Sequence, residues 1–208
     1  MIPIYEPDLT GIERKYLVDT IDSGWISSQG KYIEEFETAF AERFEMNYGV
    51  ATSSCTTALH LALIGLGIGK GDEVICPDLT FIAPANMIAL TGASPVLVDV
   101  EVDTWNLSHE LVEEAITVNT KAIMVVHAFG HSARMDEIME IAEKQGIPII
   151  EDNAESPGAK YKGRVLGSFG KVSCFSFFAN KIMTTGEGGL LLTNDKDLYM
   201  LLRELRDH

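Results

Sequence analysis

Short apolar runs alternate with stretches of helical length along most of this chain, and this alternation constrains the fold more than any other feature. The runs are "YGVAT", "DEVICP", "SPVLVDV", "KAIMVVH" and "GIPIIED", which begin at residues 48, 72, 94, 121 and 146. Between them lie helical stretches such as "TTALHLALIGLG", "IAPANMIALTG" and "MDEIMEIAEKQG". Buried strands separated by helices predict an α/β fold, a three-layer α/β/α domain with a mostly parallel sheet.

Helical patterns also occur outside this alternation. The pattern predicts a first helix from an N-cap at Thr10 to Ser23, where Gly24 ends it. The segment "KYIEEFETAFAERF", residues 31–44, has apolar residues at helical spacing and predicts a second helix. The segment "NDKDLYMLLRELRDH" predicts a last, amphipathic helix that reaches the end of the sequence.

Composition excludes several classes of protein. The 208 residues include 16 basic and 31 acidic side chains, a net charge of −15, which argues against nucleic acid or an anionic membrane as partner. No apolar run approaches the roughly 18 residues of a membrane span, and the N-terminal sequence lacks a signal-peptide layout. Cys55, Cys76 and Cys174 show no disulfide or metal-site spacing, which predicts reduced thiols in a cytoplasmic protein.

In a parallel sheet, ligands bind at the carboxyl ends of the strands, so the residues that follow each run are the candidates for a site. Ser53, Ser54, Cys55, Thr56 and Thr57 pass from the first run into a helix, where hydroxyls and free amides suit a phosphate group. The same residues equally suit an ordinary helix N-cap. The chain has no Walker A motif and no dinucleotide fingerprint after its first strand.

Three other runs end in informative side chains. Glu151 and Asp152 end a strand, where a carboxylate is costly unless a cation or hydrogen bonds meet it, although a loop-bracing role is an alternative. Phe81 follows the second run, a position where an aromatic ring is usually part of the core. His127 and His131 are four residues apart, but no third ligand is evident, and we expect no metal site there.

Lys181 lies in "FSFFANKIMTTGEGG", between an apolar run and a glycine-rich turn. A lysine considered alone is usually solvated, because burying an ammonium group is costly. A phosphate cup, an aromatic residue, an acid at a strand end and a half-buried lysine are together what pyridoxal 5'-phosphate (PLP) requires. The helix holds the phosphate, the aromatic ring stacks on the cofactor, the acid pairs with the ring nitrogen and the amine forms a Schiff base.

These motifs resemble those of the DegT-type aminotransferases, which are PLP-dependent transferases of fold type I that act on nucleotide-linked keto sugars. The similar segments include "SSCTTALHLAL", "GDEVICPDLTFIAPANMI", "IEDNAESPGAKYKGRVLGSFG" and "FSFFANKIMTTGEGGLLLTND", and the resemblance covers nearly the whole chain. Family members continue well beyond this length. The resemblance therefore implies that residues 1–208 form the PLP-binding large domain, truncated before the family's small C-terminal domain.

The resemblance implies a role for each matching residue. Lys181 would bind the cofactor aldehyde and later move the proton. Asp152 would pair with the ring nitrogen, and Glu155 would lie beside the ring hydroxyl. Phe81 would stack on the ring.

The phosphate would be held by Ser176 together with the backbone amides of Cys55 and Thr56. Many relatives have glycine at the position of Cys55, so this chain departs from the family pattern there. Related dehydratases have histidine at the position of Lys181, and the lysine therefore favours amino transfer.

By the same resemblance, the donor is an amino acid, with glutamate expected, and the acceptor is a nucleotide-linked 4-keto-6-deoxy sugar. The reaction would serve amino-sugar biosynthesis for polysaccharides such as the O-antigen of lipopolysaccharide. The enzyme would be a homodimer with a shared active site. The alternatives are a catalytically incomplete or regulatory member of the family that keeps the fold, and an unrelated α/β binding domain.

Overall fold

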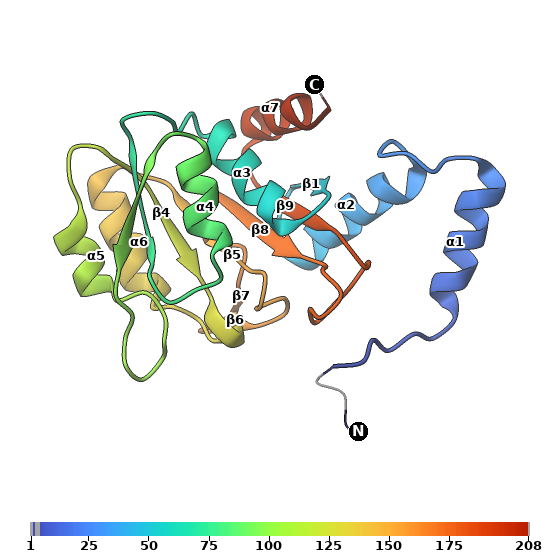
Figure 1. The fold of residues 1–208 in the computed structure, drawn as a ribbon, viewed down its shortest axis with the longest axis horizontal. Helices are drawn as coiled ribbons and strands as arrows, with labels where there is room; N and C mark the ends of the chain where they lie inside the picture. The colour runs from blue at the N-terminus through green and yellow to red at the C-terminus, as the bar shows by residue number, and fades with distance from the viewer. Residues whose placement is uncertain (1, 3–4, 208) are drawn as a thin grey trace.

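A seven-stranded sheet forms the middle layer of the structure, a computed structural model that describes residue 2 and residues 5–207 (Figure 1). Its strand order is β1-β9-β8-β5-β4-β2-β3. Within the described residues β9 runs antiparallel to its neighbours β1 and β8, and the other neighbouring strands are parallel, which confirms the mostly parallel sheet. The strands are β1 (Tyr48–Thr52), β2 (Glu73–Pro77), β3 (Ser94–Val98), β4 (Thr120–Val126), β5 (Ile149–Asp152), β8 (Val172–Ser176) and β9 (Gly189–Thr193).

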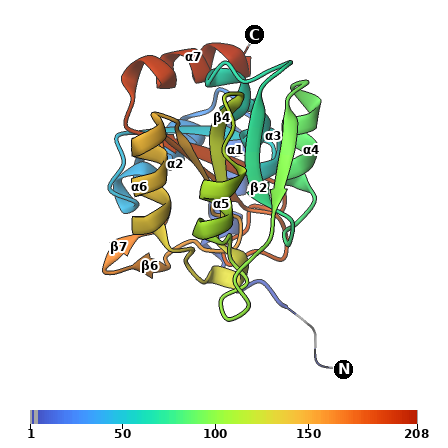
Figure 2. The same cartoon turned by 90° about the vertical axis from the view of Figure 1, so that its left-hand side faces the viewer.

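Helices cover both faces of this sheet, as the three-layer prediction requires (Figure 2). Side chains alternate along the strands, so that Met124 of β4 packs on one face while Ile123 and Val125 pack on the other. Helices α3 (Cys55–Gly65), α4 (Ala83–Leu90) and α7 (Lys196–Asp207) cover the face of Met124. Helices α2 (Lys31–Arg43), α5 (His109–Ala115) and α6 (Met135–Gln145) cover the opposite face.

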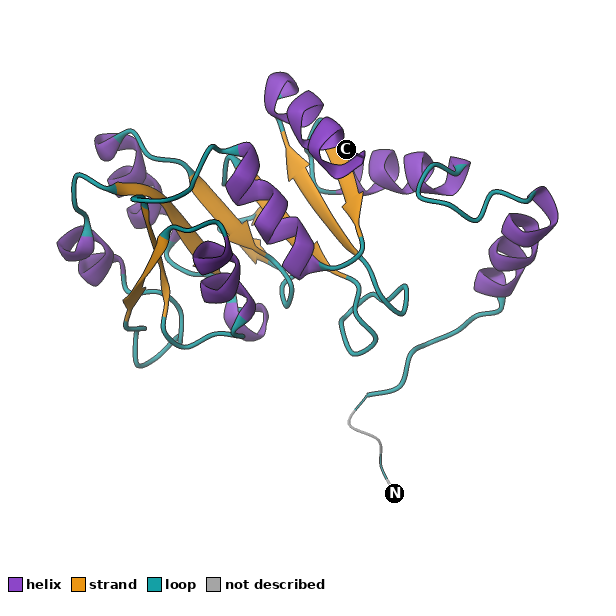
Figure 3. Cartoon of the chain, turned by 45° about the horizontal axis from the view of Figure 1, so that its top comes forward, coloured by secondary structure: helices purple, strands orange, loops and turns teal. Residues whose placement is uncertain are grey.

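Helix α1 (Ile12–Ser23) lies apart from the sheet and has no buried residue (Figure 3). Gly24 ends it as predicted, in a left-handed conformation that lets its N–H reach the carbonyl of Ile21. The predicted N-cap at Thr10 is wrong, because the helix begins two residues later and Gly11, at φ 92°, occupies the N-cap position. The carboxylate of Glu13 accepts the Gly11 N–H at 2.8 Å and the Thr10 hydroxyl at 3.3 Å, so both groups are bound outside the helix.

The sequence pattern did not indicate several short elements. The strands β6 (Lys160–Tyr161) and β7 (Arg164–Val165) form a separate hairpin of two residues each, too short to show an alternation. A single 3-10 turn, η1 (Ala128–Gly130), follows β4.

No helix among the described residues is long and apolar enough to cross a bilayer. The three cysteines are buried and free.

Candidate active site

A cavity of about 600 Å³ lies at the carboxyl ends of β2, β4, β5 and β8, beside the N-terminus of α3. This is the edge of the sheet at which a ligand was expected. All seven residues to which the sequence assigned a role line it, although they come from four separate segments of the chain. They are Cys55, Thr56, Phe81, Asp152, Glu155, Ser176 and Lys181.

The N-terminus of α3 forms one side of the cavity. Ser54 is the N-cap, and its Oγ accepts the N–H of Thr57 at 3.1 Å, which confirms the N-cap alternative for this serine. The amides of Cys55 and Thr56 find no acceptor among the described residues. Two free amides at the positive end of a helix dipole are suited to an anion, so the Ser54 N-cap is compatible with the predicted phosphate site.

Gly189, the first residue of β9, lies directly against this helix end. A Cβ added there would come within 2.3 Å of the Ser54 carbonyl carbon and oxygen and 2.5 Å of the Cys55 nitrogen. Only glycine allows the strand to pass this close to the helix. The position of the free amides is therefore set by backbone packing between α3 and β9.

Lys181 follows β8 in a turn that closes on itself, because the Phe177 N–H donates to the Gly188 carbonyl at 2.9 Å. The side chain is 20% exposed, and its Nζ lies 3.7 Å from Oε1 of Glu155. The other carboxylate oxygen of Glu155 accepts the N–H of Phe129 at 2.7 Å. The lysine is thus half-buried, as the sequence predicted, and directed toward an acid whose position is fixed.

Asp152 ends β5 and is buried beside the cavity. Its Oδ1 accepts the N–H of Ala154 at 3.0 Å and the thiol of Cys55 at 3.8 Å. Burial raises its pKa, and the Ala154 amide and the charge of Lys181 offset only part of that effect.

Ser176 is buried at the end of β8, whereas Phe81 is 75% exposed and its ring is accessible from solvent.

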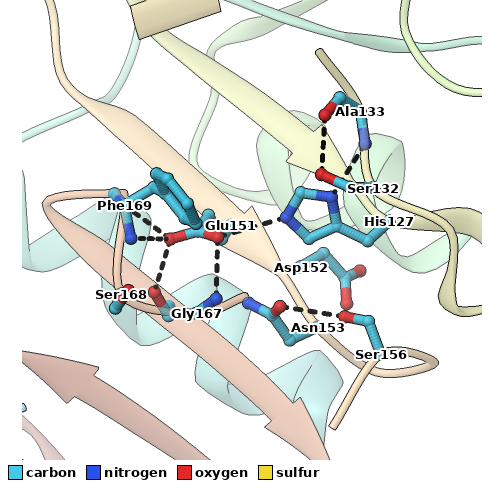
Figure 4. A network of polar contacts seen from close by, with 12 residues as sticks. His127, Ser132, Ala133, Glu151, Asp152, Asn153, Ser156, Gly167, Ser168 and Phe169 are labelled. Atoms are coloured by element: carbon cyan, nitrogen blue, oxygen red, sulfur yellow. Dashed lines mark hydrogen bonds and ion pairs between the residues drawn. The ribbon is translucent and has the colours of Figure 1, made fainter. Parts of the chain in front are cut away.

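Glu151, the neighbour of Asp152, points to the opposite face of the sheet and is fully buried (Figure 4). It accepts five hydrogen bonds, from His127 Nε2, Ser173 Oγ and the amides of Gly167, Phe169 and Gly170. Burial alone would raise the pKa of Glu151, but the hydrogen bonds from His127, Gly170 and Gly167 outweigh it and lower that pKa. No sequence pattern indicated these donors, most of which follow Glu151 by 16 to 22 residues.

The two histidines do not share a site. His127 Nε2 lies 3.1 Å from Oε2 of Glu151, and its Nδ1 accepts the Ala133 N–H at 3.3 Å, so both ring nitrogens are engaged. Because Nδ1 accepts the Ala133 N–H, the donor toward Glu151 is Nε2–H. His131 Nδ1 instead lies 3.0 Å from the Ser132 carbonyl.

Phe129 and Thr80 are two of the cavity-lining residues that sequence reasoning missed. Phe129 adopts a left-handed conformation, with φ 54°, and is 74% exposed. The hydroxyl of Thr80 is buried and has no hydrogen-bond partner among the described residues. Neither carries a recognisable pattern, although Thr80 directly precedes Phe81 and Phe129 lies in the loop that holds the two histidines.

Comparison with known proteins gives matches over nearly the whole chain. The sequence profile of the DegT/DnrJ/EryC1/StrS aminotransferase family matches residues 7–208. The GDP-perosamine synthase of Escherichia coli O157:H7 is 52% identical over 198 residues, which are 95% of this chain and 54% of that protein.

Solved structures agree with the fold. The aminotransferase from Psychrobacter cryohalolentis superposes with a TM-score of 0.95 at 40% identity, over 99% of this chain and 53% of that one. A Streptococcus pneumoniae protein solved in a PLP form gives 0.93 at 34% identity, over 98% of this chain and 57% of that one. The chain thus spans about half the length of the relatives that it matches.

Proposed function

The chain belongs to the DegT/DnrJ/EryC1/StrS aminotransferase family, and on that premise we propose that its site binds PLP and transfers an amino group to a nucleotide-linked keto sugar. One observation carries the proposal. A half-buried lysine, a buried aspartate and two free helix amides, which the sequence singled out separately, line one cavity of about 600 Å³. That combination matches the amine, acid and anion site that PLP needs.

The residues present fit the cofactor. The amides of Cys55 and Thr56 are two donors that find no acceptor among the described residues, at the place where a phosphate would lie. The buried Thr80 hydroxyl, likewise unpartnered in the described part of the chain, supplies a further polar group for a bound molecule. Ser176 adds a hydroxyl at the end of β8.

When bound, PLP supplies an aldehyde that takes up an amino group and a conjugated ring that withdraws electrons from the reacting carbon. The chain's own residues bind and move protons around it. Lys181 would supply the amine that binds the aldehyde, and the same amine would accept and donate protons beside it. Asp152, as the anion, would hold a proton on the ring nitrogen, and Phe81 would cover the ring. Glu155, fixed by Phe129, lies beside Lys181 and orients its amine.

For the acceptor, we infer a GDP-linked 4-keto-6-deoxy sugar, aminated as in perosamine synthesis for polysaccharides such as the O-antigen of lipopolysaccharide. The support is the similarity to the E. coli GDP-perosamine synthase at 52% identity. Lysine at position 181, where the resemblance places histidine in dehydratases, supports amino transfer over dehydration. We infer glutamate as the donor from the family resemblance.

The remaining features of the assembly are also proposals. Residues 1–208 would correspond to the PLP-binding large domain, and the enzyme would be a homodimer with a shared active site. Exposed apolar side chains on and after α1, among them Leu17, Ile21, Trp25 and Ile26, support a protein partner for this region. The three free, buried cysteines support a reducing compartment, the cytoplasm.

The test is the visible absorption spectrum of the purified protein with PLP, before and after glutamate is added. We expect a band that disappears in Lys181→Ala and that glutamate bleaches. Lys144→Ala is the matched control, because Lys144 is an exposed lysine paired with Glu113 and distant from the cavity lining. Sugar nucleotides with a 4-keto group are then screened as acceptors.

A band that glutamate does not change would favour the alternative function, a catalytically incomplete or regulatory member of the family. The absence of any band in the wild-type protein would contradict cofactor binding itself.

A further inference from the structure

The two carboxylate oxygens of Asp152 have different surroundings. Both of its hydrogen bonds, from the Ala154 amide at 3.0 Å and the Cys55 thiol at 3.8 Å, end on Oδ1. Among the described residues no donor reaches Oδ2. One oxygen is therefore fixed by the protein, and the other keeps its full capacity to accept a hydrogen bond.

Cys55 is able to act as this donor. It is the first residue of α3, only 7% exposed, and it lines the cavity. Burial raises the pKa of the Cys55 thiol well above its ordinary value, and the negative charge of Asp152 raises it further. The sulfur thus keeps its proton at neutral pH, as a donor to an anion requires.

The same residue also carries one of the two amides that find no acceptor within the described residues. Close packing of Gly189 against Ser54 and the Cys55 nitrogen fixes the helix end from which both groups project. Cys55 therefore connects the anion site at the helix N-terminus with the acid at the end of β5.

We propose that the Cys55 side chain is a positioning residue: its thiol holds Oδ1 of Asp152 and thereby presents Oδ2 to the protonated nitrogen of the cofactor ring. This inference rests on the proposed function. It gives a role to the position at which the chain departs from the glycine of many relatives. A glycine there has no side chain to reach Asp152, so the Ala154 amide would then be the remaining donor on Oδ1.

A packing role predicts different behaviour. If Cys55 only fills space, any small side chain should serve, and substitution should change stability rather than the bound cofactor. If it donates a hydrogen bond, Cys55→Ala should weaken cofactor binding, and Cys55→Ser, which keeps a donor, should restore it. Cys76→Ala is the matched control, because Cys76 is a fully buried thiol of β2 that does not line the cavity.

The experiment measures the dissociation constant for PLP and the pH at which the spectrum of the bound cofactor changes. We expect Cys55→Ala to raise the dissociation constant roughly threefold to tenfold, the loss of one weak charge-assisted hydrogen bond. The spectral transition should move to higher pH by up to about one unit, because a carboxylate with one hydrogen-bond donor fewer is a stronger base. Cys55→Ser should stay within about twofold of wild type by the same measure.

The outcomes separate this inference from the proposed function. A wild-type protein that binds no PLP would overturn both. Normal binding and an unshifted spectrum in Cys55→Ala would overturn the inference alone, as would equal losses in Cys55→Ala and Cys55→Ser. If Cys55→Ala unfolds at a lower temperature, Cys55→Val, which keeps the volume without a donor, replaces it in the same comparison.

Discussion

Glu151→Gln is the substitution that most directly tests the reasoning about the buried network. The carboxylate accepts three donors on Oε1 and two on Oε2, the latter from His127 and the Gly167 amide (Figure 4). A glutamine would keep its oxygen toward the three donors and turn its NH₂ toward the other two. His127 cannot adapt by moving its proton to Nδ1, because that nitrogen already accepts the Ala133 N–H.

The magnitude follows from the number of groups left without a partner. The new NH₂ and the Gly167 N–H would face each other in a fully buried place. Each unsatisfied buried group costs about 1–3 kcal/mol, so we expect the free energy of unfolding to fall by about 3–5 kcal/mol.

Equilibrium unfolding in urea measures this loss as a lower midpoint at an unchanged slope. Glu113→Gln is the control, since Glu113 is an exposed carboxylate that meets a single lysine, and its midpoint should stay at the wild-type value. A loss in Glu151→Gln below about 1 kcal/mol would refute the reasoning, because one unsatisfied donor already exceeds it.

The pH dependence of stability is a second, independent test of the role of Glu151. The pKa of Glu151 in the folded state lies below its ordinary value of 4.5, so its stabilising contribution is fully present above that value. The contribution is lost as the pH falls through the folded-state pKa. The difference in stability between wild type and Glu151→Gln should therefore narrow as the pH falls through the folded-state pKa of Glu151.

Two further substitutions test the helix end at the cavity. Gly189→Ala should displace the N-terminus of α3, because the new Cβ would lie 2.3 Å from the Ser54 carbonyl; a PLP titration should show at least a roughly tenfold loss of affinity. Ser54→Ala removes the acceptor of the Thr57 N–H and should lower the unfolding free energy by about 1 kcal/mol in urea. Wild-type affinity in the first variant, or wild-type stability in the second, would contradict the packing and capping described above.

The layers of this fold could be predicted because buried positions recur in the sequence with the period of a strand or a helix. The segment "YGVAT" coincides with β1, and the segment of residues 31–44 coincides with α2 to within one residue. The antiparallel direction of β9 could not be predicted in this way, because a fully buried strand has the same composition whether it runs parallel or antiparallel to its neighbours. The start of α1 depended on competition between Glu13 and Thr10 for the helix end, which residue types alone do not decide.

For the site, residue chemistry identified the groups and the structure shows their surroundings. A charged side chain directly after a buried strand is unusual, and this made Lys181 and Asp152 identifiable from the sequence. Alternation along β5 places Glu151 and Asp152 on opposite faces, but the sequence alone does not say which face holds the cavity. The thiol contact of Cys55 with Asp152 joins residues 97 positions apart, and no local pattern reports it.

The place of β9 between β1 and β8 has a consequence for the order in which the protein matures. Strand β1 has β9 as its neighbour in the sheet, and beside that pair Asn47 N donates to Asn194 Oδ1 across 147 positions of sequence. During synthesis, β1 therefore stays unpaired until β9 has been made. Contacts so distant in sequence slow folding. The helix end that carries the free amides of Cys55 and Thr56 is therefore held in place only once β9 has been made.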